Sequence, residues 1–238
     1  MKKNLVLILS LVCLFGPRWA QALNLGEIRT EVRLHIKDSN TSRQNYSDTQ
    51  VNNIINQVHR DVVNLTWVVK KSTSLELTDE TTHYALPTDL IQIARLTFRD
   101  ENMEEMSLAG LDGEFSDSDW ETAGGYPDKY YQNPVLPGYV SFYPYPNSST
   151  STGTVKINYF AQSNTLSSDS NTPFNGDYRY QDYSDILIWG AVYEIYVIEG
   201  RVDKAQYYGN LYESRLMIMR EGLAKIPNWW PSFSGQRK

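Results

Sequence analysis

The stretch that decides the fold is SDTQVNNIINQVHRDV, residues 47–62. Five apolar residues recur in it at spacings of three and four: Val51, Ile54, Ile55, Val58 and Val62. Such spacing places them on one face of an α-helix. Ser47 and Gln50 have the spacing of a capping box, in which side chains satisfy backbone N–H groups at a helix start. The pattern therefore predicts a helix that begins near Ser47 and fades near Trp67.

Three further segments have helical patterns. Residues 25–37 precede the first helix, and residues 183–199 and 202–222 lie near the end of the chain. Gly200 suits the end of the third helix, because glycine readily adopts the left-handed conformation that follows many helices. Amphipathic helices must bury their apolar faces against one another. We therefore expect the pair at each end of the chain to meet in one four-helix bundle.

The middle of the chain has the shorter patterns of β-strands. Strand-like runs occur at residues 74–77, 82–86, 89–98, 139–143 and 154–160. The first two are joined by a short turn. The last two flank a Ser/Thr-rich turn, so we expect them to pair as a hairpin. Residues 100–125 are polar and acidic, which indicates a long loop or a lid.

These patterns predict an α+β fold, a four-helix bundle formed by the N- and C-terminal helix pairs with an inserted antiparallel β module. The bundle would comprise residues 23–70 and 182–225, and the β-rich insertion residues 71–181. Residues 226–238 would form an aromatic C-terminal docking tail.

Residues 1–22 have the pattern of a secretory signal. Two lysines precede an apolar run from Leu5 to Phe15, and Ala20-Gln21-Ala22 is a small-x-small cleavage site. The run is too short to span a bilayer. Cleavage would remove Cys13, the only cysteine, and so exclude disulfides and thiolate metal sites from the mature chain. The alternative is an apolar segment that stays on the protein and packs against a partner.

The sequence offers little chemistry. A net charge of −6 argues against broad binding of nucleic-acid phosphates. No two of the histidines have a metal-ligand spacing: His35, His59 and His83. An acidic stretch holds carboxylates that could serve a glycan hydrolase, although a solvated loop is the better interpretation: Asp117, Asp119 and Glu121. We therefore predict a protein that is not an enzyme and has no metal or cofactor.

Aromatic residues are abundant, with 17 Tyr and 6 Trp in 238 residues. Tyr and Trp are favoured at interfaces, because one end is apolar and the other forms hydrogen bonds. The candidate partner-binding residues in the β module are Tyr126, Tyr130, Tyr131 and Tyr143. Packing within the β module explains the same tyrosines equally well. In the tail, the candidate anchors are Trp229, Trp230 and Phe233.

Several short motifs follow one another in a recognisable order. They are Tyr46-Ser47-Asp48-Thr49-Gln50, Tyr84-Ala85-Leu86-Pro87-Thr88-Asp89-Leu90, Gly125-Tyr126-Pro127-Asp128-Lys129-Tyr130, a strand ending at Pro144-Tyr145-Pro146, Val155-Lys156-Ile157-Asn158-Tyr159 and the helix pair from Tyr183 to Leu211. In this order they resemble the head–tail adaptor (connector) proteins of tailed bacteriophages. The resemblance covers about residues 25 to 223.

The resemblance implies a virion structural protein of the neck or tail. Copies would form a homo-oligomeric ring, usually twelvefold, whose helices face the portal protein and whose remainder contacts tail or nozzle proteins. The ring would line a channel through which DNA passes without specific binding, and an acidic surface suits that role. No catalytic residues carry over.

A signal-like N-terminus departs from this family, because an adaptor assembles in the cytosol. It favours a second hypothesis, a secreted or periplasmic bacterial protein that binds a glycan or protein ligand through its tyrosine-rich β face.

Overall fold

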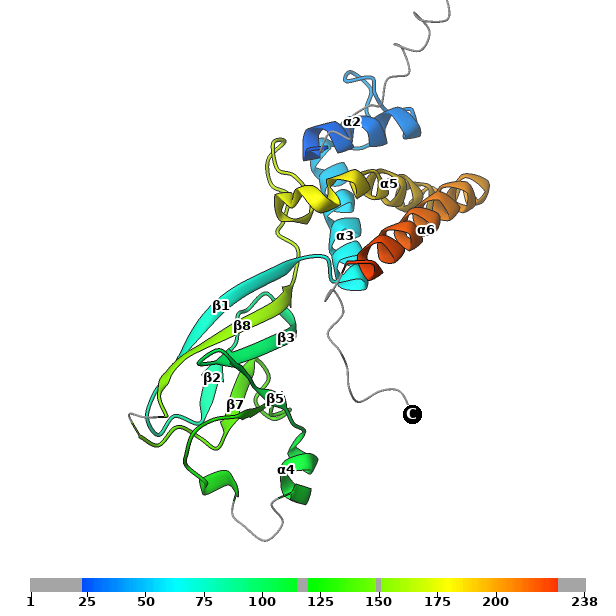
Figure 1. The fold of residues 1–238 in the computed structure, drawn as a ribbon. Helices are drawn as coiled ribbons and strands as arrows, with labels where there is room; N and C mark the ends of the chain where they lie inside the picture. The colour runs from blue at the N-terminus through cyan, green and yellow to red at the C-terminus, as the bar shows by residue number, and fades with distance from the viewer. Residues whose placement is uncertain (1–22, 115–119, 149–150, 227–238) are drawn as a thin grey trace, which may run out of the picture. The chain divides into compact units, whose positions relative to one another are not determined.

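The computed structural model describes residues 23–114, 120–148 and 151–226 (Figure 1). The chain divides into two compact units. Among the described residues, the helical unit comprises residues 23–62 and 163–222, and the β unit comprises residues 63–162 and 223–226. The signal-like segment at residues 1–22 and the predicted anchors Trp229, Trp230 and Phe233 lie outside the described residues.

The first two helices begin with reciprocal side-chain caps. Helix α2 spans Leu25–Ile36, and its start is capped by Asn24 and Glu27, whose side chains each accept a backbone N–H of the other. Helix α3 spans Asp48–Thr66. At its start the Gln50 N–H donates to Ser47 Oγ (3.2 Å) and the Ser47 N–H donates to Gln50 Oε1 (2.8 Å). The capping box predicted from the sequence is thereby confirmed.

Helices α5 (Asp185–Ile198) and α6 (Val202–Ala224) are joined by a tight turn. Gly200 adopts a φ of 68°, as the sequence predicted. Its N–H donates to Val197 O (3.0 Å), and the N–H of Arg201 donates to Tyr196 O (2.9 Å). This pair of bonds is a Schellman motif, which satisfies carbonyl groups that the end of α5 leaves without helical partners.

Helix α5 forms the centre of the helical unit. Its buried residues cover nearly the whole helix circumference: Ile186, Leu187, Ile188, Gly190, Ala191, Val192, Ile195 and Tyr196. A methyl group on Gly190 would lie 2.5 Å from Val58 Cγ1 on α3 and 3.1 Å from Tyr212 Cδ2 on α6. On another side, the Tyr196 hydroxyl donates to His35 O on α2 (3.0 Å). Helix α5 therefore contacts all three other helices of its unit.

The β unit contains two four-stranded sheets (Figure 1). The first has the order β1 (Lys70–Leu77), β8 (Gly153–Ala161), β3 (Leu90–Phe98), β4 (Glu101–Asn102), and all its pairs are antiparallel. The second has the order β2 (His83–Ala85), β7 (Tyr139–Tyr143), β6 (Lys129–Tyr131), β5 (Glu104–Glu105). Between β5 and β6 lie helix α4 (Leu108–Glu114) and a short 3-10 helix, η2 (Trp120–Thr122).

The predicted pairing of the strands is wrong in two respects. Strands β7 and β8 do not form a hairpin: β7 pairs with β2 and β6, whereas β8 pairs with β1 and β3. The β module is also not wholly antiparallel, because β5 and β6 pair in parallel. By joining the other sheet, β8 gains a neighbouring strand on each side and buries Val155 and Ile157 completely. A hairpin with β7 would have supplied one neighbour only.

The described residues thus form an α+β protein with five α-helices and two sheets. Residues 100–125, predicted as a loop, contain β4, β5, α4 and η2. The arrangement of the four long helices as a bundle stays a prediction.

We expect the substitution Gly190→Ala to lower the free energy of unfolding of the helical unit by about 1–3 kcal/mol, because the added methyl group overpacks the contact with α3 and α6. Gly113→Ala is the matched control, since nothing lies within 4 Å of a methyl group at this exposed position. Denaturant unfolding followed by circular dichroism measures both. Equal stability of the two variants would contradict close packing at Gly190.

Candidate interaction surfaces

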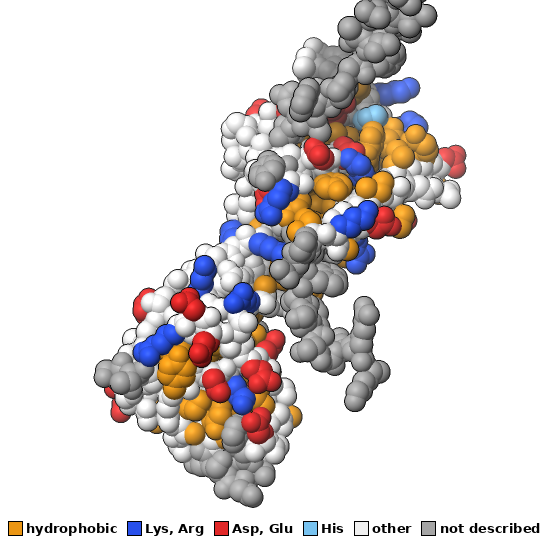
Figure 2. Space-filling model, viewed as in Figure 1, with side chains coloured by type: hydrophobic (Ala, Val, Ile, Leu, Met, Phe, Trp, Pro, Cys, Tyr) orange, Lys and Arg blue, Asp and Glu red, His pale blue; other side chains and the backbone are white. Residues whose placement is uncertain are grey.

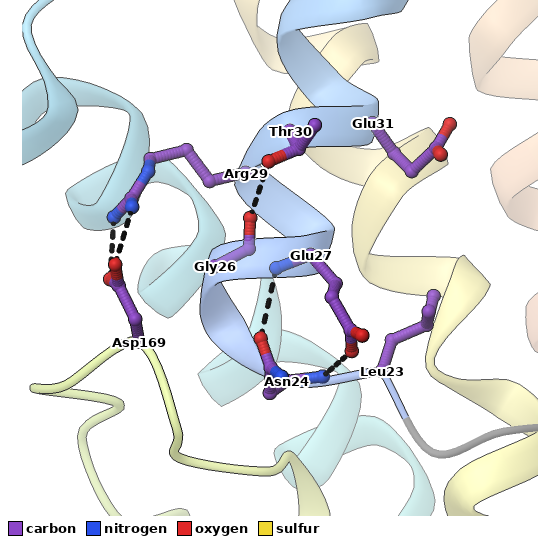
Figure 3. Close-up of a pocket in the computed structure, with 8 residues that line it drawn as sticks. All are labelled: Leu23, Asn24, Gly26, Glu27, Arg29, Thr30, Glu31 and Asp169. Carbon is purple, nitrogen blue, oxygen red and sulfur yellow. Dashed lines mark hydrogen bonds and ion pairs between the residues drawn. The ribbon is translucent and has the colours of Figure 1, made fainter.

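A pocket opens beside the start of α2 (Figure 3). It is lined by Leu23, Asn24, Gly26, Glu27, Arg29, Thr30, Glu31 and Asp169. Arg29 donates two hydrogen bonds to the Asp169 carboxylate, each 2.8 Å long. This carboxylate lies on the segment that joins the β unit to the second helix pair. Figure 3 shows that the pair occupies one wall of the pocket.

The start of α2 has no N–H group left for an anion. The Leu25 N–H donates to Asn171 O (2.9 Å), the Gly26 N–H donates to Asp169 O (3.1 Å), and Asn24 takes the next two N–H groups through its side chain and carbonyl. A helix start binds anions through free N–H groups. We therefore interpret the pocket as a structural contact between α2 and the connecting segment.

A buried ion pair fixes the connection between α2 and α3. Arg33 Nη1 lies 2.9 Å from Asp38 Oδ2, and the two side chains are only 7% and 2% exposed. Arg33 also reaches Asp48 Oδ1 at 2.6 Å. The Asp38 carboxylate accepts the N–H groups of Asn45 (2.7 Å) and Tyr46 (3.2 Å). Because both charges are paired and hydrogen-bonded, their burial is tolerated.

The segment that returns from the β unit is bound to α3 by two buried side chains. Asn56 donates to Leu166 O (3.0 Å) and accepts the Leu166 N–H (2.8 Å). His59 Nε2 accepts the N–H of Phe174 (3.0 Å). Desolvation by burial, aided by the positive charge of Arg60, lowers the pKa of His59 to about 4. His59 is therefore a neutral structural residue at pH 7.

The geometry of the described residues does not support the hypothesis of a glycan hydrolase. Within the part of the chain that the structure describes, no group of three or more His, Cys, Asp or Glu side chains is placed to hold a metal ion. Glu121 lies exposed on η2. Its proposed companions Asp117 and Asp119 lie outside the described residues.

Two of the four candidate tyrosines are buried within the β unit. Tyr130 is 5% exposed and Tyr131 is 8% exposed. Desolvation by burial raises the pKa of both phenols above the ordinary value. The Tyr130 hydroxyl donates to Glu105 Oε2 at 3.3 Å. In the isolated chain, both side chains therefore support the packing of the second sheet.

The other two tyrosines lie in different aromatic contacts. Tyr126 is 41% exposed, and its ring centroid lies 5.1 Å from that of Phe98. Tyr143 is half-buried, and its ring centroid lies 6.3 Å from that of Trp120, which also contacts Tyr131 at 5.6 Å. The structure thus brings Tyr131 and Tyr143 together around Trp120. The role of all four in partner binding stays a prediction.

Sequence reasoning did not identify a set of exposed apolar side chains on the helical unit. They are Leu34 at the end of α2, Val197 and Ile198 at the end of α5, and Val202, Tyr207, Met217 and Ile218 on α6. Their exposed fractions run from 46% for Ile218 to 73% for Val202. Leu34, Ile198 and Met217 lie beside the apolar stripes that predict the buried helix faces, whereas Val202 fits the stripe of α6 and is nevertheless exposed. Exposed apolar surface of this kind is typical of protein contacts.

Sequence reasoning also missed how unevenly the charge is distributed. Residues 63–162 contain 14 Asp and Glu against 6 Lys and Arg, a net charge of −8. The rest of the chain contains 14 acidic and 16 basic residues, a net charge of +2. Figure 2 shows many of the carboxylates gathered on the β unit. Counting charges by segment would have revealed this from the sequence.

We expect Asp38→Ala to destabilise the helical unit by about 3 kcal/mol, because it removes the buried counter-charge of Arg33 and leaves only the exposed Asp48 as a partner. The matched control is Asp169→Ala, which removes the partner of Arg29 at a side chain that is 66% exposed. Thermal unfolding should show a clear loss for the first variant and little change for the second. Similar midpoints for both would contradict the assigned importance of burial.

Stability should also depend on His59. Its pKa is near 6.5 in the unfolded chain and about 4 in the folded one, so the unfolded state takes up the proton first as pH falls. The contribution of neutral His59 is thus fully present above pH 6.5 and is lost progressively between pH 6.5 and 4, by about 3 kcal/mol. Denaturant unfolding across this range should show a shallower pH dependence in His59→Gln. If the unfolding free energy depends on pH equally steeply in the variant, His59 is not the cause of that dependence.

A comparison with known protein families gives a match over most of the chain. A model of the SU10 adaptor protein family matches residues 23–230, which include both units. No curated protein matches the chain. None of the helices in the described ranges combines the length and the apolar character needed to cross a membrane. The family match covers most of the sequence and agrees with the motif order described above. The chain therefore belongs to the SU10 adaptor protein family, a family of phage head–tail adaptors.

Proposed function

We propose that this protein is a virion structural protein that forms a homo-oligomeric ring between the portal and the tail of a phage. In this proposal the partners are the portal protein and tail or nozzle proteins, and the ring lines the channel through which DNA leaves the head. The family match supports the adaptor role, and adaptor families of this type are generally not enzymes.

One observation carries the channel proposal, which is the negative charge of the β unit. Its exposed carboxylates are Glu76, Asp79, Glu80, Asp100, Glu101, Glu104, Glu105, Asp112, Glu114, Glu121 and Asp128. Repetition of this unit around a ring would multiply the charge and create a strongly negative wall. Such a wall repels DNA phosphates, so DNA would pass without binding. Figure 2 shows part of this acidic surface.

The exposed apolar side chains of the helical unit support ring formation. A cyclic ring needs two different surfaces on each copy that fit each other. Val197, Ile198 and Val202 surround the turn between α5 and α6, whereas Met217 and Ile218 lie four to five turns further along α6. We propose that such apolar positions are covered by neighbouring copies or by the portal. The family match does not support the secreted alternative.

The test is quantitative peptide mass spectrometry on density-purified phage particles from the source culture. We expect this protein in a fixed ratio to the portal protein, as a ring component requires. Cryo-electron microscopy of the same particles should show a ring of its copies below the portal. Recovery of the chain from the periplasmic fraction alone would exclude the adaptor role.

A further inference from the structure

One part of the acidic β unit carries no charge. Between Lys129 and Lys156 the sequence contains no Asp, Glu, Lys or Arg. This run includes part of β6, the β6–β7 loop (residues 132–138) and the whole of β7. Residues 63–162 have a net charge of −8, so a run of this length without charge separates one surface from the acidic remainder.

The sheet register gathers further uncharged residues around the β6–β7 loop. Ala85 pairs with Tyr139 and Tyr131 pairs with Ser141, so β2 and β6 both end where β7 begins. Strand β5 runs parallel to β6 and ends at the same place. The residues that follow β2 and β5 are Leu86, Pro87, Met106 and Ser107. This end of the second sheet is therefore uncharged in β2, β6 and β7, whereas β5 ends in the exposed Glu105.

The loop presents apolar side chains to solvent. Val135 is 81% exposed, the largest fraction among the exposed large hydrophobic residues of the described chain. Tyr139 is 43% exposed and Leu136 is 36% exposed. Single exposed apolar residues are common, but three within five residues form a small projecting apolar surface.

The loop is also held in one conformation. Asn133 accepts the Val135 N–H through its side chain (2.9 Å) and the Leu136 N–H through its carbonyl (3.0 Å). Gly138 has a φ of 84°, and its carbonyl accepts the Leu86 N–H (2.8 Å). Pro134 and Pro137 restrict the backbone further. Because the loop is already ordered, binding through it would cost little conformational entropy.

We propose that the β6–β7 loop docks into an uncharged apolar pocket of a different protein, with Val135 at its tip. A charged pocket does not fit, because its charges would lose water and find no counter-charge within the loop, residues 132–138. The pocket of Figure 3 on a second copy does not fit the loop either, because charged residues line it, among them Arg29, Glu27 and Asp169. The identification of the partner as a tail protein rests on the proposed adaptor function.

The experiment places a photo-crosslinker in the loop of the full chain during phage assembly. Val135→benzoylphenylalanine is compared with Thr82→benzoylphenylalanine, an exposed position that precedes β2 at the opposite end of the same sheet. We expect position 135 to link to one protein other than this chain, at a segment without charged residues. The yield should exceed that at position 82 by about tenfold or more, and Val135→Ser should reduce infectious titre by about tenfold while the melting temperature stays unchanged.

The outcomes separate this proposal from the adaptor function. A link to a tail protein supports both. A link to an apolar segment of a protein absent from purified particles supports docking by the loop and contradicts the adaptor function. A link to a second copy of the chain or to a charged segment, or a yield equal to that at position 82, would overturn the docking proposal even if the chain is found in particles.

Discussion

The close contact of three helices at Gly190 is the constraint on which the helical unit depends. Helix α5 is apolar around most of its circumference, so it cannot face water on any broad side. Covering it requires α3 and α6 to approach its backbone, and only a residue without a side chain leaves room between Val58 and Tyr212. Helix α2 then covers a further side. The buried pair of Arg33 and Asp38 holds the connection between α2 and α3 in place.

The helices could be predicted from the sequence because their signals are local. The capping box at Ser47, the apolar stripe that follows it and the glycine at position 200 each act within a few residues. Strand positions could be predicted in the same way, from alternation. Their pairing could not, because β8 gains its stability from β1 and β3, which lie about 80 and 60 residues earlier in the chain. Alternation within a strand says nothing about which distant strand lies beside it.

For the candidate interaction residues too, local features could be predicted from the sequence, whereas features that depend on the fold could not. The abundance of tyrosine was visible in the sequence, but not which side chains are buried: Tyr130 lies inside the sheet, whereas Tyr126 is 41% exposed. A total charge of −6 concealed the separation of a segment with a net charge of −8, residues 63–162, from a remainder of the sequence with a net charge of +2. That separation is a property of the sequence, yet it acquires meaning only when the boundary between the units is known. The sequence showed only that no two histidines have a metal-ligand spacing, and the buried environment of His59 reveals its structural role.

The helical unit is built from two stretches of chain with both sheets of the β unit between them, and this order has a consequence for synthesis. At the ordinary translation rate of about 5–20 residues per second, α2 and α3 leave the ribosome roughly 5–20 s before α5 begins to emerge. Residues 63–162, which contain both sheets, can fold in that interval. Meanwhile Val58, which packs against Gly190 of α5 in the folded protein, lacks that partner. The nascent chain thus exposes part of an amphipathic helix pair for seconds, and transiently exposed apolar surface of this kind is prone to aggregation.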